Sequence, residues 1–110
     1  MNPTNPTNPA NTMDMENIIM EIIVNSGDVR STALEAIKTA RLGDPQKARQ
    51  MLKNCDAAML KAHEFQTNLI SCEVQGRCTE ITLLMVHAQD HLMNALTVRD
   101  LAEQIIEMID

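Results

Sequence analysis

The stretch Ala40-Arg41-Leu42-Gly43-Asp44-Pro45-Gln46 separates two long runs of helix-forming residues. Gly43 suits the position just after a helix, where the backbone takes a left-handed conformation that glycine tolerates best. Asp44 suits an N-cap, because its carboxylate can accept hydrogen bonds from the free amides of a first turn, and Pro45 suits the first helical position. These three residues predict that one helix ends at about residue 42 and another begins at residue 45.

Apolar residues at helical spacing extend on both sides of this boundary. Residues 13–42 carry such a pattern, with Asn25-Ser26-Gly27 as a weak interior that could bend the helix. After the boundary, apolar residues follow spacings of four and three from Ala48 to Cys72, interrupted only by Gln66, and a polar turn over residues 73–77 follows. Two long helices, over residues 13–42 and 45–72, are therefore expected.

A third helix is expected from Thr79, which can act as its N-cap, to about Met108, with Glu80 in the first turn. Three long helices joined by short turns predict an all-α fold, an antiparallel up-down-up three-helix bundle. A chain of 110 residues is one small domain, here placed at residues 13–110. Residues 1–12, a threefold Asn-Pro repeat, are expected to form a disordered tail.

The third helix carries two apolar stripes. The stripe that we call the inner stripe comprises Ile81, Met85, Ala88, Leu92, Ala95, Arg99, Ala102, Ile106 and Ile109. The outer stripe, about half a turn away, comprises Leu83, Val86, Asp90, Met93, Thr97, Leu101 and Met108. The inner stripe is expected to face the other two helices. An outer stripe left in water would be an exposed apolar patch, so it predicts a homo-oligomer with this helix at its centre. Symmetry would then gather several Asp90 carboxylates, which favours a bound cation.

Composition excludes several classes of function. The chain has 15 acidic and 9 basic residues, a formal net charge of −6 and no Lys/Arg cluster, which argues against nucleic acid and anionic membranes as partners. It shows neither a secretory leader nor an apolar run long enough to insert into a membrane. The three cysteines, Cys55, Cys72 and Cys78, form no Cys-x-x-Cys pair and are expected to be reduced thiols. A cytoplasmic protein is expected.

His87 and His91 share one side of the third helix, at the border between the two stripes, where a groove between subunits would open. A zinc-protease motif is excluded, because Ala88 stands where that motif needs a glutamate. Two alternatives stay open for this pair of histidines. One is a non-enzymatic helical scaffold, and the other is a metal-binding bundle, for which His63 is the only further imidazole.

The segment Val86-His87-Ala88-Gln89-Asp90-His91-Leu92-Met93 resembles the signature of a known family. This is the lactose/cellobiose-type IIA family of the bacterial phosphoenolpyruvate-dependent sugar phosphotransferase system. Residues 23–31 and 62–70 resemble family segments in the first two helices, and the resemblance covers residues 15–109. The segment from Ser71 to Thr79 departs from the family pattern, which leaves the conformation of that turn open.

The resemblance implies a phosphocarrier. His87 would accept a phosphoryl group from the histidine-containing carrier HPr and pass it to a cysteine of the cognate IIB component, which acts with a membrane IIC permease. Asp90 from three subunits of a homotrimer would surround a divalent metal ion, most simply Mg²⁺, and Gln89 and His91 would support the site. The sugar could be N,N′-diacetylchitobiose, cellobiose or lactose. A neutral imidazole is a suitable nucleophile for such a relay, and no nucleotide-binding loop is required.

Overall fold

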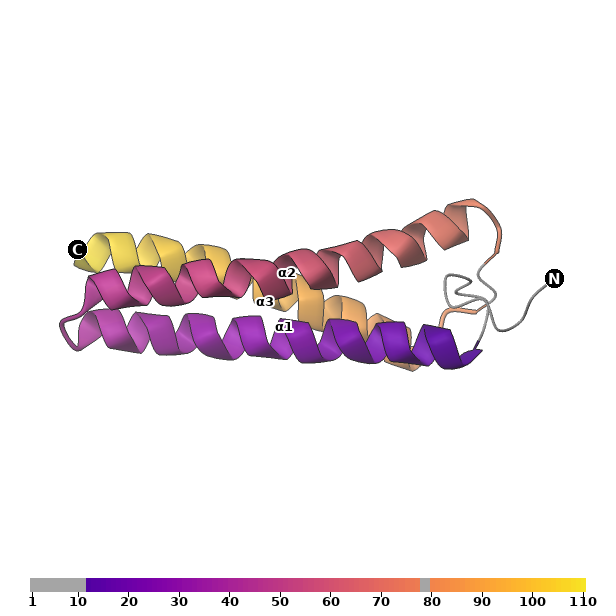
Figure 1. Ribbon diagram of the computed structural model, residues 1–110, viewed down its shortest axis with the longest axis horizontal. Coiled ribbons are helices and arrows are strands. Elements are labelled where there is room, and N and C mark those ends of the chain that lie inside the picture. The colour runs from indigo at the N-terminus through magenta and orange to yellow at the C-terminus, as the bar shows by residue number, and fades with distance from the viewer. Residues whose placement is uncertain (1–11, 78–79) are drawn as a thin grey trace.

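Three long helices lie side by side in the computed structural model, which describes residues 12–77 and 80–110 (Figure 1). They are α1 (Thr12–Arg41), α2 (Pro45–Val74) and α3 (Leu83–Ile109). The described residues contain no strand, so the predicted all-α, up-down-up bundle is confirmed. The tail predicted for residues 1–12 lies outside the described residues, apart from Thr12, which already belongs to α1.

The turn between α1 and α2 is built as its sequence predicts. Gly43 takes a φ of 110°, in the left-handed region, and its amide donates to the Ala40 carbonyl at 3.0 Å. Asp44 is the N-cap of α2, since its Oδ1 accepts from the Lys47 amide at 3.0 Å, and Pro45 follows at the start of the helix. A helix end, a cap and a helix start therefore occupy three consecutive residues.

Replacing Asp44 with Ala is expected to lower the free energy of unfolding by about 1 kcal/mol, because the first turn of α2 loses a capping acceptor. Urea denaturation followed by circular dichroism measures this change. Asp28→Ala is the matched control, since Asp28 is an exposed carboxylate inside α1 and not at a helix end. Equal losses for the two variants would contradict the capping role.

The second turn differs from the prediction. α2 continues to Val74, and Gly76 then reverses the chain with a φ of 71°. α3 begins only at Leu83, with Thr82 as its N-cap: Thr82 Oγ1 accepts from the Met85 amide at 3.1 Å. The prediction that Thr79 caps this helix is therefore wrong, and Glu80 lies outside it. Both threonines precede helix-forming residues, so local chemistry does not distinguish them.

α1 is the helix that packs on both neighbours, whereas α2 and α3 contact each other much less. Small residues allow the helices to approach closely, and alanines make up much of the core. The α1 core residues are Ile19, Ile22, Val29, Ala33, Ala36 and Ala40. α1 runs unbroken through Asn25-Ser26-Gly27, and the Asn25 Nδ2 donates to the Glu21 carbonyl at 2.7 Å. The three residues therefore do not interrupt the helix.

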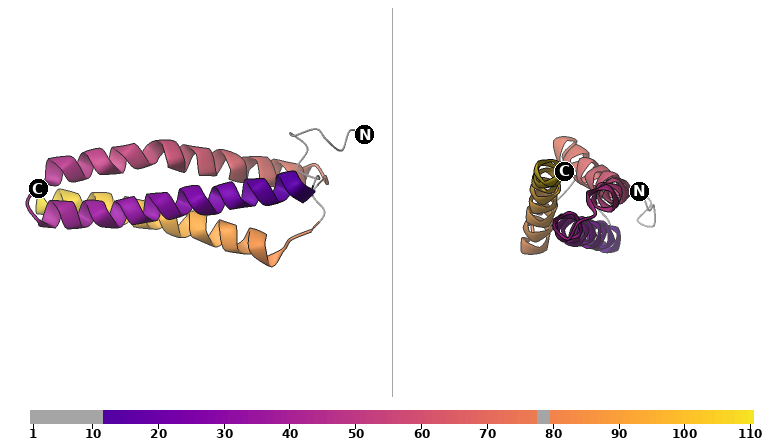
Figure 2. Two further views of the ribbon diagram at one scale, coloured as in Figure 1. Left: turned by 60° about the horizontal axis from the view of Figure 1, so that its bottom comes forward. Right: turned by 90° about the vertical axis from the view of Figure 1, so that its left-hand side faces the viewer.

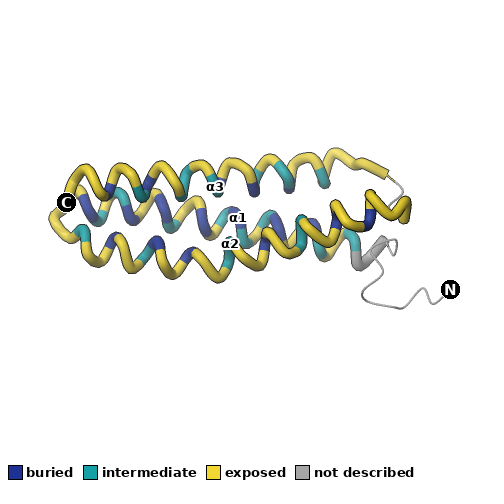
Figure 3. Tube along the Cα trace, turned by 90° about the horizontal axis from the view of Figure 1, so that it is seen from above, coloured by how far each residue is buried: buried dark blue, intermediate teal, exposed yellow. Residues whose placement is uncertain are grey.

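The inner stripe of α3 is confirmed from Met85 to Ile106. Its fully buried members, with no measurable exposure, are Ala88, Leu92, Ala95, Ala102 and Ile106. Ile81 does not belong to it, because this residue precedes the helix and is 73% exposed. Ile109 at the far end is 42% exposed, so the stripe is buried mainly along its middle. Figure 3 shows the buried positions of the three helices facing one another and the exposed positions facing out.

Arg99, the charged member of the inner stripe, ties α3 to α2. Its guanidinium forms an ion pair with Asp56 of α2 at 3.3 Å and hydrogen-bonds Glu103 one turn further along α3. Burial lowers the pKa of Arg99, but the hydrogen bond and the charges of Glu103, Asp56 and Asp100 outweigh this effect, and the net shift is upward. Arg99 therefore stays charged at the edge of the core.

The outer stripe of α3 is exposed in the single chain. Leu83 is 84% exposed, Val86 52%, Met93 53% and Leu101 56%. Asp90 is exposed between them. The stripe is therefore an apolar surface that α1 and α2 leave uncovered, as the sequence predicts. None of the helices in the described part of the chain is long and apolar enough to span a membrane.

Two cysteines fall within the described residues. Cys55 is buried and free, and burial raises the pKa of its thiol, which lies 3.4 Å from the Met51 carbonyl. Cys72 is buried and disulfide-bonded, so the prediction of reduced thiols is wrong for this residue. That prediction rested on the expected compartment and on the absence of a Cys-x-x-Cys pair.

Candidate functional site

His87 and His91 meet on the surface of α3. They lie one turn apart on the same side of the helix, and their Nε2 atoms are 3.1 Å apart. The two rings pack edge to face, with centroids 4.5 Å apart and planes at 82°. His87 is exposed, whereas His91 is half-buried. The structure therefore offers one reachable imidazole held against a second, better anchored one.

This contact restricts the protonation of the pair. Because a hydrogen bond needs one donor and one acceptor, one Nε2 must carry a proton and the other a lone pair. An imidazole nitrogen with an exposed lone pair is a nucleophile at neutral pH. The lone pair of the accepting Nε2 is engaged in this contact, so that nitrogen can act as a nucleophile, with an N–H donor beside it, once the hydrogen bond opens.

Asp90 lies on the outer stripe, with Val86 one turn before it and Met93 nearly one turn after it. Its carboxylate is exposed among apolar side chains that are themselves about half exposed. Among residues 12–77 and 80–110 of a single copy, no three His, Cys, Asp or Glu side chains lie close enough together to hold a metal ion. A metal at Asp90 would therefore need ligands from outside the described part of one chain.

Gln89 points toward α2, away from the two histidines. Its Oε1 accepts a hydrogen bond of 2.6 Å from the Nε2 of Gln66, and both side chains are half-buried. In the sequence, Gln66 stood out only because it interrupts the apolar spacing of residues 48–72, and no function was predicted for it. Its partner could not be identified from the sequence, because the pairing depends on the register of two antiparallel helices.

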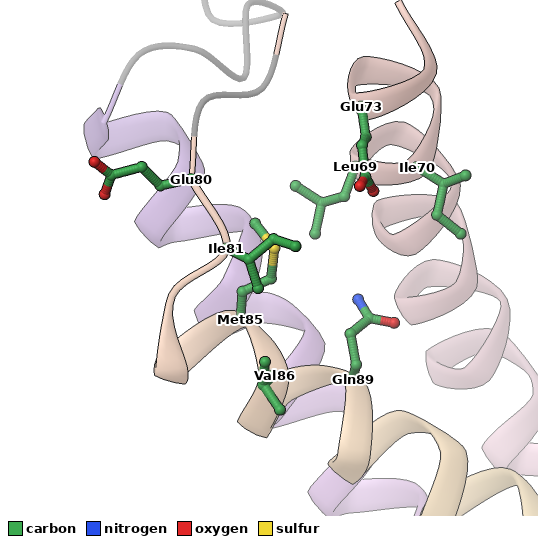
Figure 4. A pocket seen from close by; sticks show the side chains of 8 residues that line it. All are labelled: Leu69, Ile70, Glu73, Glu80, Ile81, Met85, Val86 and Gln89. Atoms are coloured by element: carbon green, nitrogen blue, oxygen red, sulfur yellow. The ribbon is translucent and has the colours of Figure 1, made fainter. Parts of the chain in front are cut away.

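A groove of about 460 Å³ opens beside Gln89, between the C-terminal end of α2 and the start of α3. Figure 4 shows side chains of both helices facing each other across it, with the Gln89 amide at one end. The residues that line it are Leu69, Ile70, Glu73, Glu80, Ile81, Met85, Val86 and Gln89. Val86 also belongs to the outer stripe, so the groove borders the outer stripe.

His63, the remaining imidazole, lies on α2 and is exposed. Its carbonyl accepts a hydrogen bond from Thr67 Oγ1 at 2.9 Å, as is usual within a helix. The ring contact described above joins His87 to His91 and does not include His63. The third ligand considered for a metal-binding bundle is therefore not part of the histidine pair.

Comparison with known proteins identifies the family. The model of the family described as "PTS system, Lactose/Cellobiose specific IIA subunit" matches residues 17–110. The chain is 53% identical over 97 residues to the lichenan-specific phosphotransferase enzyme IIA component of Bacillus subtilis, covering 88% of each protein.

Two solved structures support the same assignment. The cellobiose-specific enzyme IIA of Bacillus anthracis is 45% identical, with a TM-score of 0.82 and 86% of each chain covered. The IIA(Chitobiose) component of Escherichia coli, solved in complex with HPr, is 37% identical, with a TM-score of 0.74, covering 86% of this chain and 91% of that one. The chain, with its three-helix bundle and its histidine pair on α3, therefore belongs to the lactose/cellobiose-specific IIA family of the phosphotransferase system.

Proposed function

We propose that this protein is a phosphocarrier that accepts a phosphoryl group from phospho-HPr on His87 and passes it to a cysteine of its cognate IIB component. The observation that carries the proposal is the exposed His87 ring, whose Nε2 lies 3.1 Å from that of His91. The HPr complex of the similar E. coli IIA component supports HPr as the donor. The family description supports a sugar of the lactose/cellobiose type, and the similar B. subtilis component is specific for lichenan.

The proposed relay needs only histidine and cysteine chemistry. A neutral His87 nitrogen attacks the phosphorus of phospho-HPr, and the bond from phosphorus to the carrier's histidine breaks, so that the carrier's imidazole leaves with its electron pair. In the second step a thiolate of IIB attacks the same phosphorus, and the phosphorus–nitrogen bond to His87 breaks. Phosphoryl transfer of this kind depends mainly on in-line positioning and on charge stabilisation.

His91 is suited to support both steps. When its Nε2 carries the proton, that N–H donates to the single lone pair of the His87 Nε2, which becomes free to attack phosphorus when this hydrogen bond opens. The same N–H lies close enough to donate to an oxygen of a phosphoryl group carried by His87. A half-buried ring loses little freedom on making this contact, so His91 acts as a fixed donor beside the nucleophile.

The proposed phosphocarrier assembles as a homotrimer through α3: the outer stripe supports an oligomer, and the number of three subunits is what the family resemblance implies. Such an assembly would cover the exposed apolar side chains and bring one Asp90 from each copy to the symmetry axis. Carboxylate oxygens fit a hard divalent ion such as Mg²⁺, which keeps several of its waters. When bound, the ion would neutralise carboxylates that otherwise repel one another.

A direct test is to incubate the protein with phosphoenolpyruvate, enzyme I and HPr. We expect one phosphate per chain, stable in alkali and labile in acid, as a phosphohistidine is. The incorporation must require HPr, and omitting HPr is the control. Absence of label would contradict the proposal and favour a helical scaffold, whereas metal binding by both His87 and His91 without phosphate uptake would favour a metal-binding bundle.

A further inference from the structure

Gln66 and Gln89 are hydrogen-bonded to each other where α2 and α3 separate. Figure 2 shows the C-terminal half of α2 and the N-terminal half of α3 diverging, and the groove beside Gln89 lies in this region. The two amides lie 2.6 Å apart and are half-buried. They form a direct polar link between α2 and the part of α3 that carries the histidine pair.

Apolar packing sets which face of this part of α3 is turned toward the core. The side chains that it buries are Ala88, a single methyl group, and Leu92, and Met85 is half-buried. Apolar contacts are not directional, whereas a hydrogen bond requires a defined distance and angle. The Gln66 amide therefore adds a directional constraint on the rotation of α3 about its own axis to the apolar contacts of the core.

The rotation of α3 decides where His87 points. An α-helix turns about 100° per residue, so Gln89 projects about 200° away from His87, on nearly the opposite side of the helix. Because α2 holds Gln89 from one side, His87 is presented on the other, next to the outer stripe. A small rotation of α3 would move the ring of His87 relative to both the solvent and the two proteins that must reach it.

We propose that Gln66 is a positioning residue, which fixes the Gln89 amide and thereby the direction in which His87 is presented for phosphoryl transfer. This inference rests on the proposed function of His87. Figure 4 shows the Gln89 oxygen on the side of α2 and its nitrogen turned toward the groove. Gln66 therefore donates to the side-chain oxygen of Gln89, and the N–H donors of Gln89 face the groove.

Gln66→Met is the test variant, because methionine has a similar length and shape but cannot donate a hydrogen bond. We expect the maximal rate of transfer from phospho-HPr to fall about tenfold, the size of effect produced by a slightly misplaced reacting group. The phospho-HPr concentration giving half the maximal rate should stay unchanged. The imidazole nitrogen resonances of His87 and His91 should shift in the unphosphorylated protein.

Gln66→Glu is the rescue variant. If the Gln89 side-chain amide rotates by 180°, its N–H can donate to the new carboxylate. The rate of transfer should then recover to within about twofold of the wild-type rate. Gln50→Leu is the matched control. Gln50 donates to Asn54 at 3.0 Å within α2 itself, so its loss removes a glutamine hydrogen bond without releasing α3. This control should transfer phosphate at the wild-type rate.

Three results would overturn the inference: an unchanged maximal rate for Gln66→Met, a change confined to the half-saturating concentration, or a Gln66→Glu variant as slow as Gln66→Met. A failure of the proposed function would give a different experimental result from a failure of this inference. If His87 is not the acceptor, the wild-type protein itself carries no label on His87. The imidazole resonances still report the effect of Gln66 in that case, because they need no phosphate.

Discussion

His87→Gln is expected to take up no phosphate from phospho-HPr, while its helical content stays that of the wild type. Glutamine keeps a polar side chain at this exposed position, but its amide nitrogen has no nucleophilic lone pair. The ring contact with His91 is on the surface, so its loss should change the free energy of unfolding by less than about 1 kcal/mol. Incorporation of labelled phosphate and circular dichroism measure the two properties.

His91→Gln is the matched control for this experiment. It removes the other imidazole of the pair but leaves the ring of His87 in place, so transfer should slow and the covalent phosphohistidine should still form. Peptide mapping under alkaline conditions identifies the labelled residue. Label retained by His87→Gln, or label that maps to His91, would show that the nucleophile has been assigned to the wrong imidazole.

Asp90→Leu is expected to produce a trimer that no longer depends on a divalent cation. The substitution removes like charges from the proposed subunit contact and extends the apolar surface that Val86 and Met93 form. Burying a leucine side chain contributes about 1.5–3 kcal/mol, so subunit association should tighten by tenfold or more. Sedimentation with and without EDTA measures this, and the wild-type trimer is expected to weaken in EDTA.

Asp28→Leu is the control for this substitution, because Asp28 is exposed on α1, away from the outer stripe. It should leave both the assembly and its response to EDTA unchanged. An Asp90→Leu protein that sediments as a monomer would show that the carboxylate itself is needed for assembly. In that case the outer stripe would not be the subunit contact.

Those features of the fold that depend only on residues adjacent in the chain could be predicted from the sequence. Gly43, Asp44 and Pro45 act within a single turn, so their chemistry is sufficient to place the first helix boundary. The start of α3 could not be placed in the same way. Thr79 and Thr82 are equally good caps by local chemistry, and the choice of Thr82 leaves Ile81 outside the helix and exposed.

The placement of the two histidines was predictable from the sequence, whereas the contacts around them were not. Helical spacing correctly placed His87 and His91 on one side of α3, because four residues make about one turn. The bond between Gln66 and Gln89 joins residues on different helices, and its formation depends on how far one helix is shifted along the other. The position of one helix along the other cannot be predicted from a single sequence. The role that we propose for Gln66 therefore depends on the three-dimensional structure.

The central place of α1 has a consequence for the order in which the molecule forms and opens. α1 and α2 are joined by a tight turn and pack along each other, whereas α3 contacts mainly α1 and only lightly α2. Contacts between chain neighbours form fastest, so the α1–α2 hairpin should form first and α3 should dock last. By the same reasoning, α3 should be the first helix to detach, and in isolated chains its amide protons should exchange with solvent earliest. The helix that carries His87 would then be held in place partly by neighbouring copies of the protein, so that amide exchange in α3 becomes a direct measure of assembly.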